Sequence, residues 1–484
     1  MTIGDSPEFR YQADSAAEPG QAGASTQARH AVARAHSADL ELTWFLYADH
    51  GGIIRGKAAA TEFLAERIAS GIGHTTAMMA ISMLETLHPV DGMSPVGEVR
   101  IKPDPATMVP LPYAPGAGAM LSDLVRPDGE PWEACPRAFL KQAIADLADA
   151  GYAMSAAFEP EFTLGRREPD PAGGPDRLVP VDDSLCYSAT GFHQAHDYVM
   201  ELVRALNAQG LRVEHYYPEL GHGQQEVAIR YAGALRAADN HVLYRETVRG
   251  VAFRRGLWAS LAPKPIAGQA GNGTHLHASL TSLPADGSPG EQAFADPDDQ
   301  YGLSETGYHF IGGLLAHLPA LVAITCGSVN SYRRLQPQFW SSAYAIYGMD
   351  NREAAVRICS PLRGDPTASV NLELKPSDST ANPYLALGAF IQAGLDGIQR
   401  KLDPGDAVNV DPETLTAAQR EAIGARRLPL SLTEALDALA ADELLMSKLG
   451  PLRSSAYLAV KRGEAAGFAE HDTDWECFQH FLRF

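Results

Sequence analysis

The sequence predicts an α+β fold in which helices flank a largely antiparallel sheet. Helical and strand-like segments alternate along the chain without the regular strand–helix–strand rhythm of a parallel sheet. Residues 42–47 and 53–57 are strand-like runs on either side of the turn sequence Asp49-His-Gly-Gly, which predicts a hairpin. The chain has 484 residues, enough for two or three domains and a large core.

Composition divides the chain into three segments. Residues 1–37 are rich in Ala, Gly, Ser, Gln and Glu and show no periodic apolar face, so we expect a disordered extension. Residues 38–127 hold short strands and turns and predict a small β-rich domain. The turn-rich stretch that begins at Pro127 predicts a boundary, so residues 128–484 form a second, larger domain in this interpretation.

Net charge and cysteine content exclude several classes of protein. The formal charge of -20 argues against nucleic acid or an anionic membrane as the main partner. The five cysteines are widely spaced and form no CxxC pair, so a disulfide framework is not expected. No secretory signal pattern is visible, and we expect a cytoplasmic protein. The apolar run at residues 311–329 carries His317 and Pro319, and it predicts a buried core helix, not a membrane span.

One segment of the N-terminal domain fits a phosphate-binding loop in part. Residues 51–57 match G-x-x-x-x-G-K, but Ala58 stands where the Mg²⁺-binding Ser or Thr of such a loop belongs. The flanking glycines favour the hairpin instead.

Two carboxylates lie close together in a strand-like run of the larger domain. Glu159 and Glu161 are two residues apart, so a strand would place both on one face. On a half-buried face their like charges would be unfavourable without a cation, which a divalent metal would supply. The alternative is an edge strand whose glutamates face water.

Further acids and a histidine follow in other strand-like or loop segments. Together they offer five carboxylates and one imidazole: Glu159, Glu161, Glu219, Glu226, His275 and Glu373. A basic stretch further along contains Arg333, Arg334, Arg352 and Arg357. Their guanidinium groups can donate paired hydrogen bonds to phosphate oxygens. Acids for metal and arginines for phosphate describe a phosphoryl-transfer site.

Several motifs resemble those of a known family. They are Glu159-Pro-Glu-Phe, Gly223-Gln-Gln-Glu, Gly271-Asn-Gly-Thr-His, Asn330-Ser-Tyr-Arg-Arg and Ala381-Asn-Pro-Tyr. In this order they are similar to the signatures of the glutamine synthetase family, from about Leu40 to the end of the chain. The resemblance implies a β-grasp-like N-terminal domain, a catalytic domain with a curved antiparallel sheet, and homo-oligomeric rings, commonly a dodecamer.

The resemblance also implies an activity. ATP would phosphorylate the γ-carboxylate of L-glutamate, and an amine would then attack the acyl phosphate to form an amide. Two or three Mg²⁺ or Mn²⁺ ions would serve each site. One ion would lie among Glu161, Glu219 and Glu226, and another among Glu159, His275 and Glu373.

By matching position, the resemblance assigns the remaining roles. Residues expected to bind glutamate are Gly271, Arg334 and Lys375. Residues expected around ATP are Glu214, Tyr231, His277 and Ser279, with Arg352 and Arg357 on the transferred phosphate. Asp49 is expected to reach toward the amine in the neighbouring subunit's site.

The sequence departs from the family pattern where the amine should bind. A flap that reads Pro-Gly-Tyr-Glu in glutamine synthetases reads Pro337-Gln-Phe-Trp here, so Trp340 replaces an acid. Phe339 and Trp340 would offer an aromatic wall to an amine larger or less charged than ammonium. Alternatively, both rings are packing residues at a subunit contact.

Two further departures fall near the phosphate and glutamate positions. Asn371 replaces an arginine that lies beside the phosphate in the family, and Arg333 or Arg363 would then take that role. Lys375 replaces an arginine that helps to hold glutamate; it keeps the positive charge but not the paired hydrogen-bond donors of a guanidinium.

We therefore expect a ligase that joins glutamate to an organic amine, with aromatic or short alkyl monoamines favoured. An ordinary glutamine synthetase that uses ammonia, or a γ-glutamylpolyamine synthetase, is the alternative. A non-catalytic scaffold and an unrelated nucleotide-dependent kinase are less consistent with the motifs.

Overall fold

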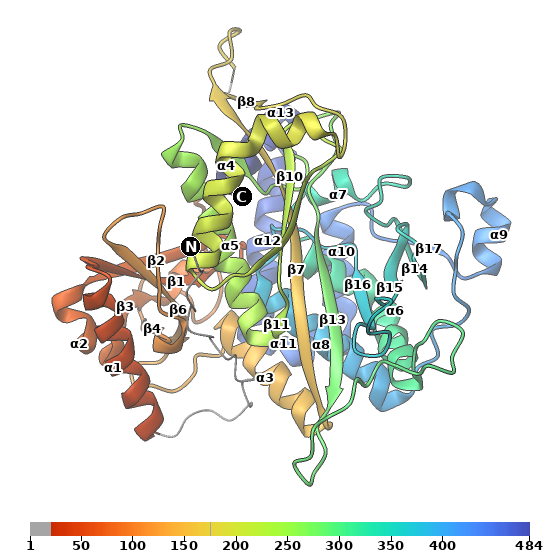
Figure 1. Ribbon diagram of the computed structural model, residues 1–484, viewed down its shortest axis with the longest axis horizontal. Coiled ribbons are helices and arrows are strands. Elements are labelled where there is room, and N and C mark those ends of the chain that lie inside the picture. The colour runs from red at the N-terminus through yellow and green to blue at the C-terminus, as the bar shows by residue number, and fades with distance from the viewer. Residues whose placement is uncertain (1–20, 175) are drawn as a thin grey trace, which may run out of the picture.

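A computed structural model describes the backbone of residues 21–174 and 176–484. It has a small N-terminal domain and a larger domain built on a long mixed sheet (Figure 1). The two domains join between the last strand of the first sheet, which ends at Val125, and a helix that begins at Pro136.

The N-terminal domain is built on one sheet of six strands. Their order is β2-β1-β6-β4-β3, with β5 paired to β6. The strands are β1 (Leu42–Ala48), β2 (Ile54–Ala60), β3 (Ile72–Thr75), β4 (Glu98–Pro103), β5 (Val109–Pro110) and β6 (Ala117–Val125), with helix α2 (Leu64–Ser70) beside them. Strands β1 and β6 run parallel and the other pairs run antiparallel. The β-grasp-like expectation is therefore met.

The first two strands form the predicted hairpin. β1 pairs with β2 from Leu42 opposite Ala60 to Ala48 opposite Ile54. Gly52 turns the chain with a φ of +84°, and a Cβ atom there would lie 2.0 Å from the Thr380 carbonyl oxygen. Because this glycine-rich stretch is a hairpin turn against the larger domain, it is not a phosphate-binding loop.

The expectation of disorder before residue 38 is wrong for its second half. Helix α1 spans Gln21–Ser37, while residues 1–20 lie outside the described residues. Ala31 and Ala35 are buried in the core of the N-terminal domain, with Ala28 and Val32 packed beside them. These four positions have helical spacing, but their side chains are so small that the sequence shows little hydrophobic periodicity.

The larger domain is organised around one long strand, β7 (Tyr152–Glu168). The sheet order is β17-β14-β15-β16-β13-β7-β10-β9, and β8, β11 and β12 also pair with β7. The other strands are β8 (Arg177–Pro180), β9 (Val213–Pro218), β10 (Gln224–Ile229), β11 (Ala232–Gly233), β12 (Trp258–Ser260), β13 (Thr274–Ser282), β14 (Tyr344–Met349), β15 (Ala354–Cys359), β16 (Asn371–Leu374) and β17 (Arg426–Arg427). All pairs are antiparallel except β14 with β15. The sheet is therefore largely antiparallel, as the sequence predicts.

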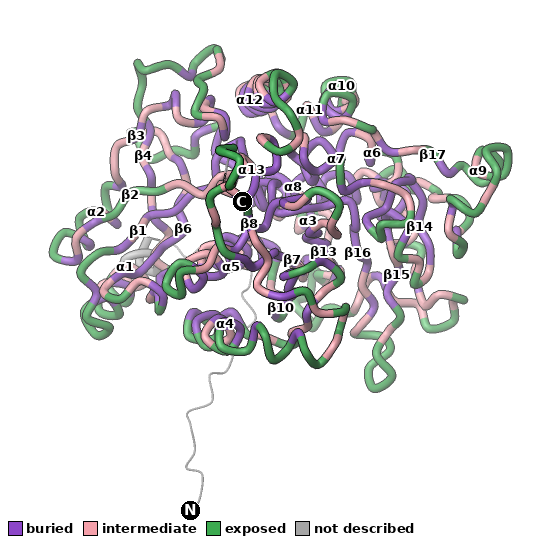
Figure 2. The backbone as a smooth tube through the Cα atoms, turned by 90° about the horizontal axis from the view of Figure 1, so that it is seen from above, coloured by how far each residue is buried: buried purple, intermediate pink, exposed green. Residues whose placement is uncertain are grey.

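Helices cover this sheet and supply most of the core. They are α3 (Pro136–Asp149), α4 (Ala189–Ala208), α5 (Ala234–Arg254), α6 (Glu305–Thr325), α7 (Ser331–Arg334), α8 (Pro383–Arg400), α9 (Ala417–Ala422), α10 (Leu432–Ala441), α11 (Glu443–Leu449), α12 (Pro451–Ala469) and α13 (Thr473–Arg483). Figure 2 shows buried backbone around α8, whereas α9 is exposed at the rim. Within the described residues, α6 is the one helix long and apolar enough to cross a membrane, and 78% of its apolar window is buried. It is a core helix of the folded domain.

One buried arginine ties the two domains together. Arg137 on α3 is 2% exposed and forks onto Asp239 of α5 at 2.9 and 3.0 Å. The same guanidinium contacts Asp104 at 2.8 Å and Asp123 at 3.2 Å in the N-terminal domain. Its position therefore depends on both domains being folded.

Candidate active site

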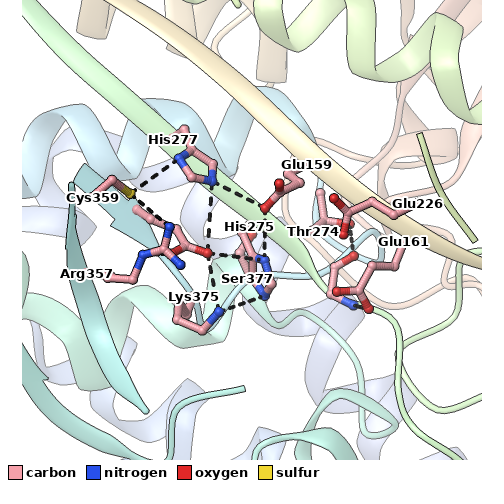
Figure 3. Close-up of polar contacts among 12 residues, drawn as sticks. Glu159, Glu161, Glu226, Thr274, His275, His277, Arg357, Cys359, Lys375 and Ser377 are labelled. Atoms are coloured by element: carbon pink, nitrogen blue, oxygen red, sulfur yellow. Dashed lines mark hydrogen bonds and ion pairs between the residues drawn. The ribbon is translucent and has the colours of Figure 1, made fainter. Parts of the chain in front are cut away.

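Strand pairing brings the acids and histidines of the site together. Glu159 on β7 lies opposite His275 on β13, and Glu161 lies opposite Glu226 on β10. His277 in turn lies opposite Glu373 on β16. Residues directly opposite one another share a face of the sheet, so this register gathers the predicted ligands on one surface. Figure 3 shows side chains of this group pointing toward one another.

Glu159, His275 and Glu373 form a compact group suited to a divalent ion. The His275 Nδ1 lies 3.3 Å from the Glu159 Oε2 and 3.3 Å from the Glu373 Oε1. One ligand atom from each residue lies within 4.8 Å of the other two. Two carboxylate oxygens and one imidazole nitrogen are a donor set that Mg²⁺ or Mn²⁺ accepts. The structure thus brings together one of the two ligand sets expected from the sequence.

The second expected set is arranged differently. The structure describes a compact group of Glu159, His215 and Glu226, and among the described residues it does not bring Glu161 and Glu219 into such a group. The Glu161 Oε2 instead accepts hydrogen bonds from the Gln224 amide at 2.7 Å and the Gly273 backbone N–H at 2.9 Å. One oxygen of Glu161 is therefore already paired with local donors.

Glu219 and Glu226 are nevertheless close to the other acids. Burial and the charge of Glu161 raise the pKa of Glu219 to about 7. Burial and the charges of Glu159 and Glu161 raise the pKa of Glu226 to about 11. Carboxylates crowded in this way favour a bound cation, because it offsets their mutual repulsion.

His215 and Tyr187 were not singled out from the sequence. His215, Tyr217 and Glu219 occupy alternate positions at β9 and just beyond it, so strand periodicity points to His215. The Tyr217 hydroxyl donates to Glu226, and its ring stacks on His215. The Tyr187 hydroxyl donates to Glu219 at 3.3 Å, but no sequence pattern indicates that contact.

The residues expected to bind glutamate converge on His275. The Arg334 Nη2 lies 3.0 Å from the His275 Nε2, and the Lys375 Nζ lies 3.4 Å from the same atom. A Cβ atom at Gly271 would lie 3.2 Å from the Arg334 Cγ, so the backbone passes close to the aliphatic part of that side chain. The structure therefore places Arg334 and Lys375 beside the metal-ligand group, with Gly271 against the Arg334 side chain.

The arginines expected at the phosphate do not lie together in the structure. The Arg357 Nε lies 2.9 Å from the Glu373 Oε2, within the acid group. Arg352 is exposed and lines a cavity of about 500 Å³ with Trp340. Arg333 forks onto Glu476 of α13 at 2.7 Å, so that guanidinium is already paired, and Arg363 lies in an exposed loop.

The residues expected around the nucleoside do not lie together either. The His277 Nε2 lies 3.3 Å from Glu159, and its Nδ1 lies 2.9 Å from the Asn371 Oδ1. Ser279 follows two residues later on β13, on the same strand face. Glu214 and Tyr231 lie at an exposed surface where both contact Arg230.

Asp49 is buried within the hairpin of the N-terminal domain. Its side chain is fully buried and accepts hydrogen bonds from the Ile53 backbone N–H at 2.9 Å and the Arg55 Nε at 2.5 Å. Within one chain, this carboxylate is therefore paired inside its own hairpin. Its role toward the amine in a neighbouring subunit's site stays a prediction.

Phe339 and Trp340 lie on an exposed loop. Their exposed fractions are 56% and 54%. The Lys264 ammonium lies 5.0 Å from the centre of the Phe339 ring. Neither ring is part of the core of this chain, so both are free to contact a ligand or another subunit.

Comparison with known proteins identifies the family. The model of the glutamine synthetase N-terminal domain matches residues 27–132, and that of the catalytic domain matches residues 133–480. The chain belongs to the glutamine synthetase family. Members of this family are ATP-dependent ligases that form C–N bonds, and the protein is such a ligase. The compact group at Glu159 fits the divalent metals that this family uses.

Named relatives include more than one activity. The chain is 37% identical over 434 residues to γ-glutamylpolyamine synthetase GlnA3 of Streptomyces coelicolor, covering 88% of this chain and 90% of that protein. It is 36% identical over 394 residues to glutamine synthetase of Halobacterium salinarum, covering 80% and 84%.

Solved structures share the glutamine synthetase fold. A glutamine synthase homologue superposes with a TM-score of 0.79 at 36% identity, covering 92% of this chain and 99% of that one. An ADP complex of GmaS superposes with a TM-score of 0.78 at 31% identity, covering 92% and 97%.

Proposed function

We propose that this ligase joins the γ-carboxyl of L-glutamate to an organic amine, with aromatic or short alkyl monoamines favoured. The observation that carries the proposal is the exposed pair Phe339 and Trp340, where an acid is expected in an enzyme that uses ammonia. Aromatic faces stabilise apolar amines and alkylammonium groups, whereas a small ammonium ion gains most from a carboxylate.

The reaction has two balanced steps. A γ-carboxylate oxygen of glutamate attacks the terminal phosphorus of ATP, the bond to the β-phosphate oxygen breaks, and ADP leaves. The nitrogen of a neutral amine then attacks the acyl carbon and the bond to the phosphate oxygen breaks. The amine nitrogen loses one proton to solvent water, and the products are a γ-glutamylamide, ADP and phosphate.

The side chains that would assist have distinct tasks. Arg334 and Lys375, with the backbone at Gly271, would orient glutamate. Arg357, with Arg352 at the nearby loop, would hold the transferred phosphate through charge-assisted hydrogen bonds.

The metal requirement follows from the acid group. Two or three Mg²⁺ or Mn²⁺ ions, bound by Glu159, His275 and Glu373 and by the neighbouring acids, would neutralise charge on the phosphates. We propose Glu161, Glu219 and Glu226 for the second set, with His215 beside them. Glu214, Tyr231, His277 and Ser279 remain our proposal for the nucleoside side.

Polyamines are the second candidate acceptors. The similarity to γ-glutamylpolyamine synthetase GlnA3 supports them. Against them, residues 337–342 themselves contain no acid, although Asp350 and Asp411 line the same cavity as Trp340. Ammonia is the acceptor that the similarity to glutamine synthetases supports.

A panel of acceptors separates these functions. The enzyme is incubated with glutamate, ATP and Mg²⁺, and phosphate release is measured with aniline, ethylamine, putrescine or ammonia, with products identified by mass spectrometry. We expect the highest kcat/KM with a monoamine. Putrescine as the best acceptor would support the second candidate, and ammonia as the best acceptor would overturn the proposal.

We also propose that the enzyme acts as a homo-oligomeric ring in the cytoplasm, as a dodecamer. Light scattering during size-exclusion chromatography tests this assembly, because twelve copies of a 51.8-kDa chain are readily distinguished from six.

A further inference from the structure

The loop that carries Phe339 and Trp340 has an unfavourable backbone conformation. Gln338, Trp340 and Ser342 have φ angles of +63°, +54° and +66°. Residues with a Cβ atom rarely adopt this left-handed region, because the Cβ clashes with the backbone. The loop therefore depends on contacts with the rest of the protein to keep this shape.

A single buried carboxylate supplies two of these contacts. The Glu353 Oε1 accepts a hydrogen bond from the Trp340 backbone N–H at 2.8 Å, and its Oε2 accepts one from the Gln338 backbone N–H at 3.2 Å. Glu353 is 7% exposed. Its two oxygens thus hold the residues on either side of Phe339.

Glu353 also adjoins the part of the site that would bind glutamate. It immediately precedes β15, where alternate residues share a face, so it lies on the face of Ala355 and Arg357. The Ala355 carbonyl accepts from the Lys375 backbone N–H at 3.0 Å. The carboxylate that fixes the aromatic loop therefore belongs to the strand that carries Arg357.

We propose that Glu353 is a positioning residue for the amine acceptor: by binding the backbone of Gln338 and Trp340, it fixes the Phe339–Trp340 wall and so determines which amines react. It acts through the loop and does not itself touch the substrate. This inference rests on the proposed function, because it assigns a determinant of amine choice.

Other contacts of the loop do not involve Glu353. The Ser341 hydroxyl donates to the Arg334 carbonyl at 2.7 Å, and the Ser342 hydroxyl donates to the Ala354 carbonyl at 2.7 Å. The Gln338 side chain donates to Asp411 at 3.1 Å. Because these contacts persist, a change at Glu353 alone leaves the loop attached and the domain able to fold.

The first test is the variant Glu353→Gln, which keeps the size of the side chain but places an NH₂ group against one backbone donor. We expect the KM for the preferred amine to rise about tenfold, because the loss of one buried hydrogen bond changes an affinity by about that factor. The KM values for ATP and for glutamate should change less than about twofold. The matched control is Glu434→Gln. In the wild type, the Glu434 carboxylate accepts a hydrogen bond from the Leu430 backbone N–H at the start of α10. An unchanged amine KM in Glu353→Gln would overturn the inference.

A second readout does not depend on activity. Hydrogen exchange of the Gln338 and Trp340 amides should become faster in Glu353→Gln and stay unchanged in Glu434→Gln. Equal exchange in Glu353→Gln and the wild type would contradict the contact itself. This outcome is separable from a failure of the proposed function, which would appear as a preference of the wild type for ammonia.

A mutant cycle shows whether Glu353 acts through the two aromatic rings. If it does, adding Glu353→Gln to the variant Phe339→Ala/Trp340→Ala lowers kcat/KM for the amine no further. If the two losses multiply, Glu353 acts independently of both rings and the inference fails.

Discussion

Arg357 and Glu373 lie directly opposite each other across β15 and β16, with the Arg357 Nε 2.9 Å from the Glu373 Oε2. The Glu373 Oε1 lies 3.3 Å from both the Lys375 Nζ and the His275 Nδ1. Burial alone would raise the pKa of Glu373, but Lys375, the histidines and Arg357 lower it to about 2. Glu373 is therefore ionised at neutral pH and connects the expected phosphate, glutamate and metal positions.

Replacing Glu373 with Gln should impair both metal use and catalysis. The change removes one charge from a metal-ligand group, and such groups contribute several kcal/mol to charge stabilisation, so we expect kcat to fall about 100-fold or more. The Mg²⁺ concentration for half-maximal activity should rise. Titration of activity with Mg²⁺ checks this, with Glu413→Gln as the control because Glu413 bonds Tyr344 on β14. An unchanged Mg²⁺ dependence would remove Glu373 from the ligand set.

Restoring an acid at the aromatic loop should shift the preference among acceptors. In Trp340→Glu the ratio of kcat/KM for ammonia to that for the best amine should rise about fivefold or more, since a carboxylate near an ammonium contributes about 1 kcal/mol or more. Trp340→Phe keeps an aromatic face and should leave the ratio near the wild-type value. If the two variants change the ratio equally, the side chain at this position does not select the acceptor.

Strand periodicity predicts only part of the site, and the assignment of the other candidate ligands depends on the family resemblance. Glu159 and Glu161 share a face by alternation, and the pairing of β7 with β13 then brings His275 opposite Glu159. The partners of Asp49 could not be predicted, because a turn sequence does not show whether its carboxylate faces solvent or an arginine.

In the fold, features set by nearby residues could be predicted, and pairings between distant segments could not. The hairpin of β1 and β2 depends on a local turn and was predicted, as was the core helix α6. The parallel pairing of β14 with β15 was not. Helix α1 was missed because alanines provide its buried face, and alanine carries little hydrophobic signal.

Removing the charge of Arg137 should destabilise the whole chain. Arg137→Ala leaves Asp239, which is 2% exposed, without its guanidinium, and breaking a buried pair in this way costs about 3–5 kcal/mol. Urea unfolding followed by circular dichroism measures the loss. Arg126→Ala is the control, because Arg126 pairs at the surface with Glu133 and such pairs contribute about 1 kcal/mol or less. Equal losses in the two variants would show that Arg137 does not tie the domains.

The stability of the helical core should depend on pH through His317. This side chain on α6 bonds Asp442 through Nδ1 at 2.7 Å and Asp396 through Nε2 at 3.1 Å, while Arg400 also pairs with Asp396. Burial alone would lower the pKa of His317, but the hydrogen bonds and charges of the two aspartates raise it above 6.5 overall.

Since protonated His317 is favoured in the folded state, its contribution is fully present below the unfolded-state pKa of about 6.5 and is lost as pH rises through the higher folded-state pKa. The free energy of unfolding of the wild type should therefore exceed that of His317→Gln by more at about pH 5.5 than at about pH 9. Urea unfolding across this range measures the difference. A difference that stays constant, or that grows with pH, would show that the pKa of His317 is not raised by folding.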